Sequence, residues 1–255
     1  MTTTAPEAPT SPAPILEAIN LDKKFGGIHA AQGVSLHVMP GEVVALAGDN
    51  GAGKSTVIKM IAGVYRPDGG EVRYEGERVD HLTPREIRER GIETIYQDLA
   101  LADNLDVGTN LFLGREKVNH FLGIPYLDRK TMRSEAEKAL KALGIVVRDL
   151  DGPVRTLSGG QRQALAIGRA VYWQARLLIM DEPTAALGVP EQREVLALIH
   201  RLKASGVGII FISHNLNDIF AVSDRIVVLE RGRKAGEKLA SETDGDEVVK
   251  MMMGG

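Results

Sequence analysis

The chain of 255 residues contains no cysteine, which excludes disulfide bonds, cysteine nucleophiles and thiolate metal sites and fits a reducing compartment such as the cytosol. It also lacks an excess of either charge: 31 Lys and Arg stand against 34 Asp and Glu, so no basic field indicates a nucleic-acid partner. No run approaches the roughly 18 consecutive apolar residues of a membrane span, and residues 1–14 lack the basic and apolar regions of a signal peptide. Any role at a membrane is therefore expected to be peripheral.

Hydrophobic residues, in contrast, make up 44% of the chain, which is enough for one sizeable core. Residues 1–14 are mostly Thr, Pro, Ala and Ser, and they lack the apolar surface that would offset the cost of ordering them. We therefore expect a flexible tail at 1–14 and a single domain at 15–255.

The order of the predicted elements indicates an α/β fold. Short β-like runs occupy 15–21, 33–40 and 42–48, and 71–79 has the pattern of a hairpin. After residue 176, strands and helices alternate, which argues for parallel strands joined by helical crossovers. The elements predicted there are a strand at 177–181, a helix at 190–204, a strand at 207–213, a short helix at 215–222 and a strand at 225–230.

A helical insertion is predicted between these two regions, at approximately 98–173. Its clearest helix lies at 128–144, where Asp128 is a candidate cap and Gly144 a candidate stop. The apolar residues between them fall at helical spacing, on positions 132, 136, 139, 140 and 143.

The stretch GDNGAGKST, residues 48–56, is the first motif that indicates a chemical function. Its glycines let successive backbone N–H groups face inward, and such a nest at a helix N-terminus binds phosphate. Lys54 then reaches the β and γ phosphates, and the Ser55 hydroxyl can coordinate Mg²⁺. The match is fairly specific because it follows an apolar strand and precedes a helix. The predicted nucleotide-binding residues of this loop are Gly48, Asp49, Asn50, Gly51, Ala52, Gly53, Lys54, Ser55 and Thr56.

An adjacent acid pair, Asp181 and Glu182, follows the apolar run 177–180. Taken alone, the pair would be read as the solvated end of a strand. A phosphate loop, however, needs a second magnesium contact, and a carboxylate at the end of a neighbouring strand can provide it, while the next one points at the attacking water. We therefore assign Asp181 to the metal and Glu182 to the water. Kinases, GTPases and helicases remain open at this point.

The stretch LSGGQ decides among these classes. Ser158, Gly159, Gly160 and Gln161 present hydroxyl and N–H groups ahead of a helix, as a second anion-binding helix start. One nucleotide would hardly need two phosphate cradles. In this order, GKST, LSGGQ, the acid pair and a histidine in FISHN resemble the ATP-binding cassette (ABC) ATPases from residue 15 onward. The resemblance implies ATP and Mg²⁺, a RecA-like parallel-sheet core, an antiparallel β subdomain and an inserted α-helical subdomain.

The resemblance also implies roles for individual residues. Phe25 occupies the position of an aromatic ring that stacks on adenine, although it could instead be an ordinary hairpin aromatic. Gln97 matches a glutamine that contacts magnesium and the attacking water, and His214 matches a switch histidine at the γ phosphate. Glu182 resembles the catalytic carboxylate, and Ser158 and its glycines would bind the ATP held by an opposite protomer. A homodimer with two sandwiched nucleotides follows.

Several stretches further resemble the ATPases of bacterial monosaccharide importers of the ribose, xylose and fructose type, and in particular the single-cassette, fructose-type branch. This resemblance implies separate membrane permease chains, an extracellular or periplasmic sugar-binding protein and a position at the cytoplasmic face of the plasma membrane. An ATPase for another cargo, such as amino acids, lipid or a drug, is the nearest alternative. A DNA-repair or chromosome ATPase would separate Lys54 from Ser158 with a long coiled coil or zinc module, and a translation factor would carry two cassettes.

The loop after the acid pair departs from the pattern of most of the family. Where most members read Ser-Ala-Leu-Asp, this chain reads Ala185, Ala186, Leu187 and Gly188. The usual serine and aspartate are missing, so only backbone groups are expected to make contacts across the dimer. The run EPTAALG itself is similar to that of the monosaccharide-importer ATPases.

Overall fold

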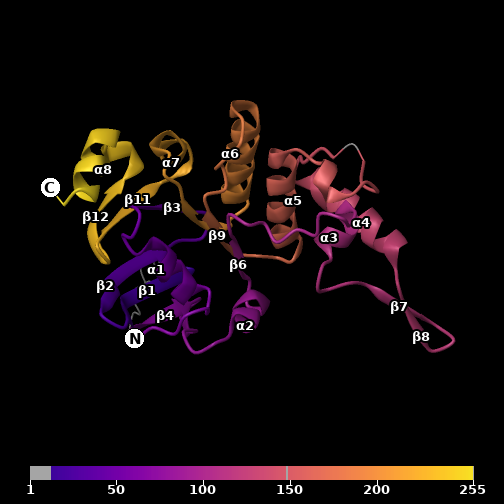
Figure 1. Cartoon of the computed structure of the whole chain (residues 1–255), viewed down its shortest axis with the longest axis horizontal. Helices are drawn as coiled ribbons and strands as arrows, with labels where there is room; N and C mark the ends of the chain where they lie inside the picture. Colours follow the sequence, from indigo (N-terminus) through magenta and orange to yellow (C-terminus); the bar gives the residue numbers. More distant parts are fainter. Residues whose placement is uncertain (1–12, 148, 255) are drawn as a thin grey trace, which may run out of the picture.

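The computed structural model describes residues 13–147 and 149–254, so the predicted tail at 1–14 lies outside the described residues apart from Ala13 and Pro14. Two main sheets organise the chain (Figure 1). The larger has six strands in the order β12-β11-β3-β10-β9-β6, all parallel except β12. Its strands are β3 (Val43–Ala47), β6 (Ile92–Ile95), β9 (Leu177–Asp181), β10 (Gly208–Ile212), β11 (Arg225–Glu230) and β12 (Arg233–Leu239).

The smaller sheet is antiparallel and has the order β2-β1-β4-β5. Its strands are β1 (Leu16–Phe25), β2 (Ile28–Val38), β4 (Gly69–Tyr74) and β5 (Glu77–Arg78). The helices of the chain are α1 (Lys54–Ile61), α2 (Pro84–Glu89), α3 (Val107–Leu111), α4 (Arg129–Ala142), α5 (Gly159–Tyr172), α6 (Val189–Ala204), α7 (Leu216–Val222) and α8 (Gly245–Met252).

The two faces of the parallel sheet belong to two different hydrophobic clusters, because side chains alternate along each strand. From β3, Val44 and Leu46 pack with α1 and the antiparallel sheet. Val43 and Ala45 face the opposite cluster, which contains residues of α5, α6, α7 and α8. All five residues of β3 and of β10 are buried. Burial on both faces explains why these strands read as continuous apolar runs rather than as alternating patterns.

The segment 98–173 contains α3, α4 and α5, which pack on one another around a cluster of Phe112, Tyr172 and Trp173. The cap predicted at Asp128 is present: its carboxylate accepts a hydrogen bond from the backbone N of Thr131 at 3.0 Å. The sequence pattern did not predict that this segment also carries a two-stranded hairpin, β7 (Val118–Phe121) and β8 (Ile124–Leu127). Residues of both strands are exposed, so the hairpin has no alternation of apolar and polar side chains.

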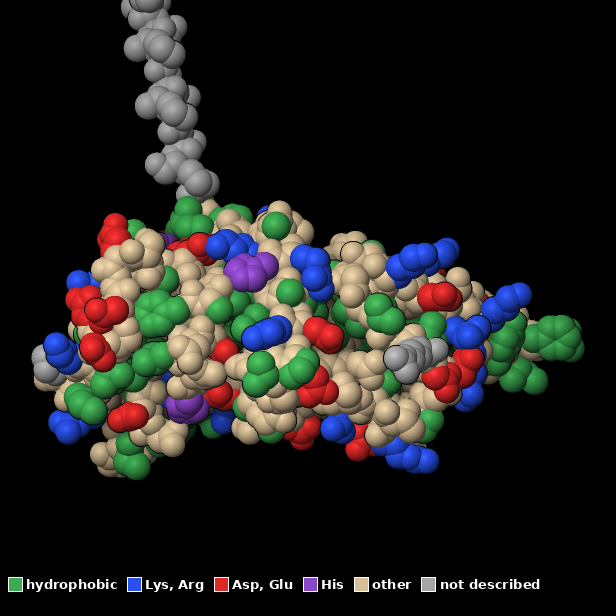
Figure 2. All heavy atoms as spheres, turned by 90° about the horizontal axis from the view of Figure 1, so that it is seen from above, with side chains coloured by type: hydrophobic (Ala, Val, Ile, Leu, Met, Phe, Trp, Pro, Cys, Tyr) green, Lys and Arg blue, Asp and Glu red, His purple; other side chains and the backbone are tan. Residues whose placement is uncertain are grey.

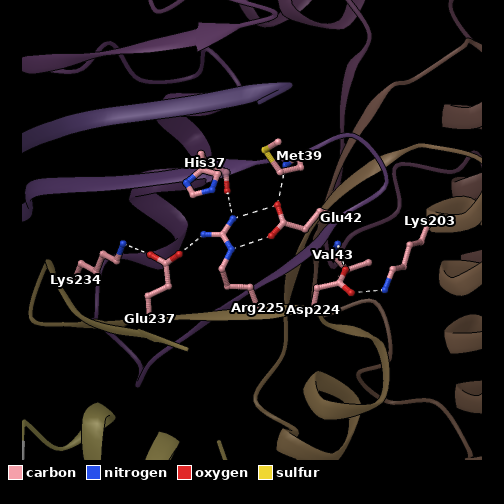
Figure 3. Close-up of polar contacts among 9 residues, drawn as sticks. All are labelled: His37, Met39, Glu42, Val43, Lys203, Asp224, Arg225, Lys234 and Glu237. Carbon is pink, nitrogen blue, oxygen red and sulfur yellow. Dashed lines mark hydrogen bonds and ion pairs between the residues drawn. The ribbon is translucent and has the colours of Figure 1, made fainter. Parts of the chain in front are cut away.

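One buried arginine joins the edges of the two sheets (Figure 3). The Nε of Arg225, at the start of β11, lies 2.8 Å from Glu42, and its Nη2 donates to the carbonyl of His37 in β2 at 2.7 Å. The same guanidinium pairs with Glu237 of β12. Although burial opposes it, hydrogen bonds from Lys234 and Arg225 hold the pKa of Glu237 below its usual value. The network therefore fixes the turn that leads into β3.

Removing this guanidinium should be costly, because Glu42 would keep its charge without the cation it pairs with, and Glu237 would keep only its pair with Lys234. We expect Arg225→Met to lower the free energy of unfolding by about 3–5 kcal/mol at pH 7, measured by urea denaturation. The matched control Arg85→Met removes only an exposed pair with Glu89 and should cost about 0.5 kcal/mol. A carboxylate with a lowered folded pKa contributes stability above its unfolded pKa, so the Arg225→Met deficit should shrink below about pH 4. Equal losses in both variants would contradict this role.

Candidate functional site

The glycine-rich loop 48–53 connects the end of β3 to the start of α1. Gly51 and Gly53 have φ values of 82° and 100°, in the region that favours glycine. A Cβ at Gly53 would lie 2.5 Å from the carbonyl oxygen of Ala30, and one at Gly48 would lie 2.3 Å from that of Leu229. The neighbouring backbone therefore leaves no room for side chains, and the loop takes the compact form that the sequence predicted.

Lys54 begins α1 directly after this loop and is 7% exposed. Its ammonium group donates to the carbonyl oxygens of Gly48, at 2.5 Å, and Asp49, at 3.0 Å. Burial lowers the pKa of Lys54, while the charges of Glu182 and Asp181 act against the shift. A desolvated cation that follows a glycine-rich loop at a helix N-terminus provides a strong site for an anion.

The acid pair lies at the edge of the parallel sheet where β9 ends. Asp181 pairs in register with Ile212 of β10, and the backbone N of Glu182 donates to the carbonyl of Ile212 at 3.0 Å. Glu182 has a φ of +53°, which is left-handed and costly for a residue with a side chain. This turn breaks the strand alternation, so both carboxylates line one cavity. Burial raises the pKa of each, although nearby cations oppose the rise.

His214 follows β10 and faces Glu182. Its Nε2 lies 3.2 Å from Glu182 Oε1, and its backbone N donates to Oε2 at 3.4 Å. Within the part of the chain that the structure describes, Glu182 Oε1 is buried and accepts no hydrogen bond, because the contact to the imidazole lacks hydrogen-bond geometry. Buried carboxylate oxygens normally have a partner, so this one is available to a water or another donor in the cavity.

The cavity has a volume of about 630 Å³ and brings most of the predicted residues together. Besides the loop residues, the acid pair and His214, Gln97 contributes from the segment that follows β6. Gly48 is not a lining residue, but its carbonyl oxygen accepts a hydrogen bond from Lys54. The predicted site residues that line it are Asp49, Asn50, Gly51, Ala52, Gly53, Lys54, Ser55, Thr56, Gln97, Asp181, Glu182 and His214.

Two predicted elements lie outside this cavity. Phe25 ends β1 and is 41% exposed, and its ring meets Tyr65 edge to face at 5.1 Å between centroids. Ser158 caps α5, where its hydroxyl accepts a hydrogen bond from the backbone N of Gln161. Gly160 and Gln161 line a second cavity instead. A single chain therefore does not bring the LSGGQ segment to Lys54.

Sequence reasoning missed a buried acid behind the site. Asp218 of α7 is 3% exposed and accepts hydrogen bonds from the Thr184 hydroxyl at 2.7 Å and from the Gln192 side chain at 2.5 Å. It thereby ties the loop after Glu182 to the helix after His214. No local pattern marks Asp218, because its partners are 34 and 26 positions away in the chain. Arg231, which also lines the cavity, was not predicted either.

The loop at Ala185–Gly188 makes side-chain contacts despite its missing polar residues. The Glu191 carboxylate accepts a hydrogen bond from the backbone N of Gly188 at 3.2 Å. Hydrogen bonds from the Ser158 hydroxyl and from that N–H hold the pKa of Glu191 below its usual value. A Cβ on Gly159 would lie 2.8 Å from the Leu187 side chain, so these elements pack closely. Across a dimer, only backbone groups of this loop are expected to make contacts. Within one chain, side chains also connect this loop to LSGGQ.

A phosphate loop at the carboxyl edge of a parallel sheet, with a buried lysine and an acid pair on the next strand but one, defines a P-loop nucleotide-binding protein. Comparison with known proteins then narrows the class. Residues 31–185 match the model of the ABC transporter family. The chain is 47% identical to the xylose/arabinose import ATP-binding protein XylG of Sulfolobus acidocaldarius, over 93% of each chain.

Further relatives agree. The chain is 45% identical to the fructose import ATP-binding protein FrcA of Rhizobium meliloti, over 87% of its own length and 86% of the relative. It is 43% identical to the ribose import ATP-binding protein RbsA 1 of Rubrobacter xylanophilus, over 94% of its own length but only 47% of that relative. Among solved structures, the ADP conformation of an ATP-binding cassette of an ABC transporter matches with a TM-score of 0.80 and 27% identity, over 95% of this chain and 100% of that one.

The chain therefore belongs to the ABC transporter family, and the predicted fold class and family resemblance are confirmed. Its ATP-binding cassette makes it an ATPase.

The contacts of Asp218 lead to a stability prediction. Asp218→Ala leaves the buried Thr184 hydroxyl and Gln192 amide without their acceptor, so we expect a loss of about 2–4 kcal/mol in unfolding free energy and a lower ATPase rate. Asp218→Asn is the matched control: the Thr184 hydroxyl can accept as well as donate, so this variant should lose less than about 1.5 kcal/mol. Urea denaturation and steady-state ATPase measurements test both. Equal stability of the alanine variant and the wild type would show that Asp218 does not hold the loop.

Proposed function

We propose that the chain is the ATP-hydrolysing subunit of a membrane transporter that imports a monosaccharide. The observation that supports hydrolysis is the cavity in which Lys54, Asp181 and Glu182 face one another. The cargo class is supported by the similarity, along most of both chains, to xylose/arabinose and fructose import ATP-binding proteins. We also propose that residues 15–255 form one ABC ATPase domain, in which 98–173 is the helical subdomain.

In this proposal the glycine-rich loop and Lys54 bind the phosphates of ATP. The N–H groups at the start of α1 would attract an anion, as at any helix N-terminus, and the cation of Lys54 is already desolvated beside them. Phe25, exposed at the end of β1, is proposed to stack on the adenine. Because Lys54 is held by two carbonyl oxygens, it is positioned before the nucleotide arrives.

Ser55, Gln97 and Asp181 are the residues proposed to hold Mg²⁺. They offer a hydroxyl, an amide and a carboxylate oxygen from one cavity wall, the hard oxygen donors that Mg²⁺ prefers. Among residues 13–147 and 149–254, no group of three His, Cys, Asp or Glu could hold a metal by itself. This donor set fits an ion that arrives with phosphate oxygens and waters as its remaining ligands. When bound, the ion would neutralise charge on the phosphates.

Glu182 is proposed to orient the attacking water. Its buried Oε1 has no hydrogen-bond donor among the described residues, and its raised pKa, caused mainly by burial, makes it a better proton acceptor than a solvated glutamate. The imidazole of His214 lies next to the same oxygen, where it can contact both the carboxylate and the terminal phosphate. The left-handed backbone at Glu182 aims the carboxylate into the cavity.

We further propose that two copies form a C₂ dimer in which Ser158, Gly159, Gly160 and Gln161 of one chain complete the site of the other. This arrangement is supported by the distance of the LSGGQ segment from the cavity of its own chain. A related cassette, 26% identical over 88% of this chain with a TM-score of 0.73, was solved as a dimer bound to ADP and phosphate. A two-fold axis would generate two identical sites.

The transporter would also need chains of other types. No helix in the described parts of the chain is long and apolar enough to cross a bilayer. We propose that separate permease subunits span the membrane, that a periplasmic or extracellular protein binds the sugar, and that this chain sits peripherally on the cytoplasmic face. The import proteins named above support a system of this kind.

Substitutions in the cavity should separate binding from turnover. Glu182→Gln should keep ATP affinity but lower kcat by at least about 100-fold, because the amide cannot accept the proton of the water. An ATP-bound dimer should then accumulate on size-exclusion chromatography, and adding Ser158→Arg should return it to a monomer that still binds ATP. Lys54→Ala should instead weaken ATP binding itself. Normal turnover of Glu182→Gln would refute the role of this carboxylate.

Cargo is tested by purifying the complex from its native membrane with the Glu182→Gln chain as bait. We expect permease subunits and a binding protein that retains a monosaccharide, identified by mass spectrometry. Recovery of an export permease, or of a binding protein loaded with an amino acid, would contradict the proposal that the chain powers monosaccharide import. It would leave the ATPase assignment unchanged.

A further inference from the structure

The hairpin formed by β7 and β8 extends from the end of the molecule beyond α3 and α4 (Figure 1). Its tip carries large apolar side chains that are mostly exposed: Phe121 is 68% exposed, Leu122 88% and Ile124 69%. Figure 2 shows these hydrophobic side chains as a projection at that end, with Lys and Arg side chains behind it. Such an exposed apolar cluster marks an interaction site rather than ordinary surface.

The turn of the hairpin has a leucine at a position that favours asparagine or glycine. Leu122 and Gly123 have φ values of +50° and +80°, so both central residues are left-handed, as in a tight two-residue hairpin turn. Asparagine or glycine suits the first of these positions, and leucine is strained there. An exposed leucine at this position stabilises neither the turn nor the hydrophobic core. We therefore infer that its side chain contacts another molecule.

The base of the hairpin is basic although the whole chain has a net charge of −3. Residues 115–133 contain five Lys or Arg and two acidic residues, and two of the five cations pair with acids outside this range, which leaves a net charge of +1. Lys117 pairs with Glu135 at 2.6 Å and Arg133 with Asp151 at 2.7 Å. Arg129 and Lys130 are exposed and make no ion pair with any described residue. Both lie in the first turn of α4, where cations act against the helix dipole.

From these three features we propose that the β7–β8 hairpin inserts its tip into the interface of an anionic lipid bilayer. Phe121, Leu122, Ile124 and Tyr126 would enter the region between headgroups and acyl chains, and Arg129 and Lys130 would contact lipid phosphates. An apolar and aromatic tip followed by a basic base suits this interface, since the apolar part is buried while the charges stay at headgroup level. A protein partner would not by itself require the charge asymmetry.

This contact goes beyond the proposed transport function, since it attaches the ATPase chain itself to the membrane and needs neither permease nor ATP. It would fix the orientation of the segment 98–173 relative to the bilayer. The cost of holding the leucine in a strained turn would be offset by removing apolar surface from water.

Vesicle flotation with the full chain tests the proposal. We expect binding to vesicles of phosphatidylcholine with phosphatidylglycerol and little binding to phosphatidylcholine alone, with affinity falling as salt rises. Leu122→Asn should lower vesicle affinity by at least about tenfold while keeping the melting temperature and ATPase rate, because asparagine favours this turn. The double variant Arg129→Gln, Lys130→Gln should bind both vesicle types equally weakly.

Two results would overturn the proposal. One is equal vesicle binding by wild type and Leu122→Asn, or none by either. The other is an absence of vesicle binding together with a Leu122-dependent association with permease subunits in detergent, which would assign the hairpin to a protein. Because no readout depends on transport or cargo, failure here is distinguishable from failure of the proposed function.

Discussion

The burial of the parallel strands on both faces is the constraint on which the site depends. Because β3, β9 and β10 are parallel neighbours, their carboxyl ends meet at one edge of the sheet. Both faces of these strands are covered by hydrophobic clusters, so polar side chains are favoured only where the strands end. The glycine loop begins directly after β3, the acid pair spans the end of β9, and His214 lies two residues after the end of β10. Desolvation at this edge lowers the pKa of Lys54 and raises those of the two acids, so one packing arrangement sets both position and charge.

Structural elements that depend on residues close together in the sequence could be predicted. The glycine loop, the helix capped by Asp128 and the buried strands β3, β9 and β10 carry their signals within a few residues, and the structure has them where the patterns indicated, whereas β6 was not predicted. Strand β12, RKAGEKL, escaped because it is a polar edge strand whose pairing to β11 decides its conformation. The β7–β8 hairpin escaped because its apolar residues have no core to alternate against, and its turn lacks the usual Asn-Gly pair.

Relations between distant residues could not be predicted from one sequence. Asp218 reads as a polar residue of a short helix, and only the fold shows it buried between Thr184 and Gln192. The left-handed backbone conformation of Glu182 could not be predicted either, because no residue in the motif indicates it. Similarity to sugar-import ATPases supports the cargo class, whereas the cavity has features suited to phosphate and water and supports only the ATPase activity.

The contact between Glu191 and the start of α5 has a mechanical consequence. The loop that follows Glu182 is tied by Leu187 and Glu191 to Ser158 and the glycines beside it, within the same chain. In the proposed dimer, the loop and the LSGGQ segment of one chain would contact different nucleotides. Because they are linked within that chain, they would move together. If the loop at one site shifted after hydrolysis, the LSGGQ segment of the same chain would move with it, away from the nucleotide of the other site. Communication between the sites would then run through each protomer's interior and would not need the side chains missing at Ala185 and Gly188.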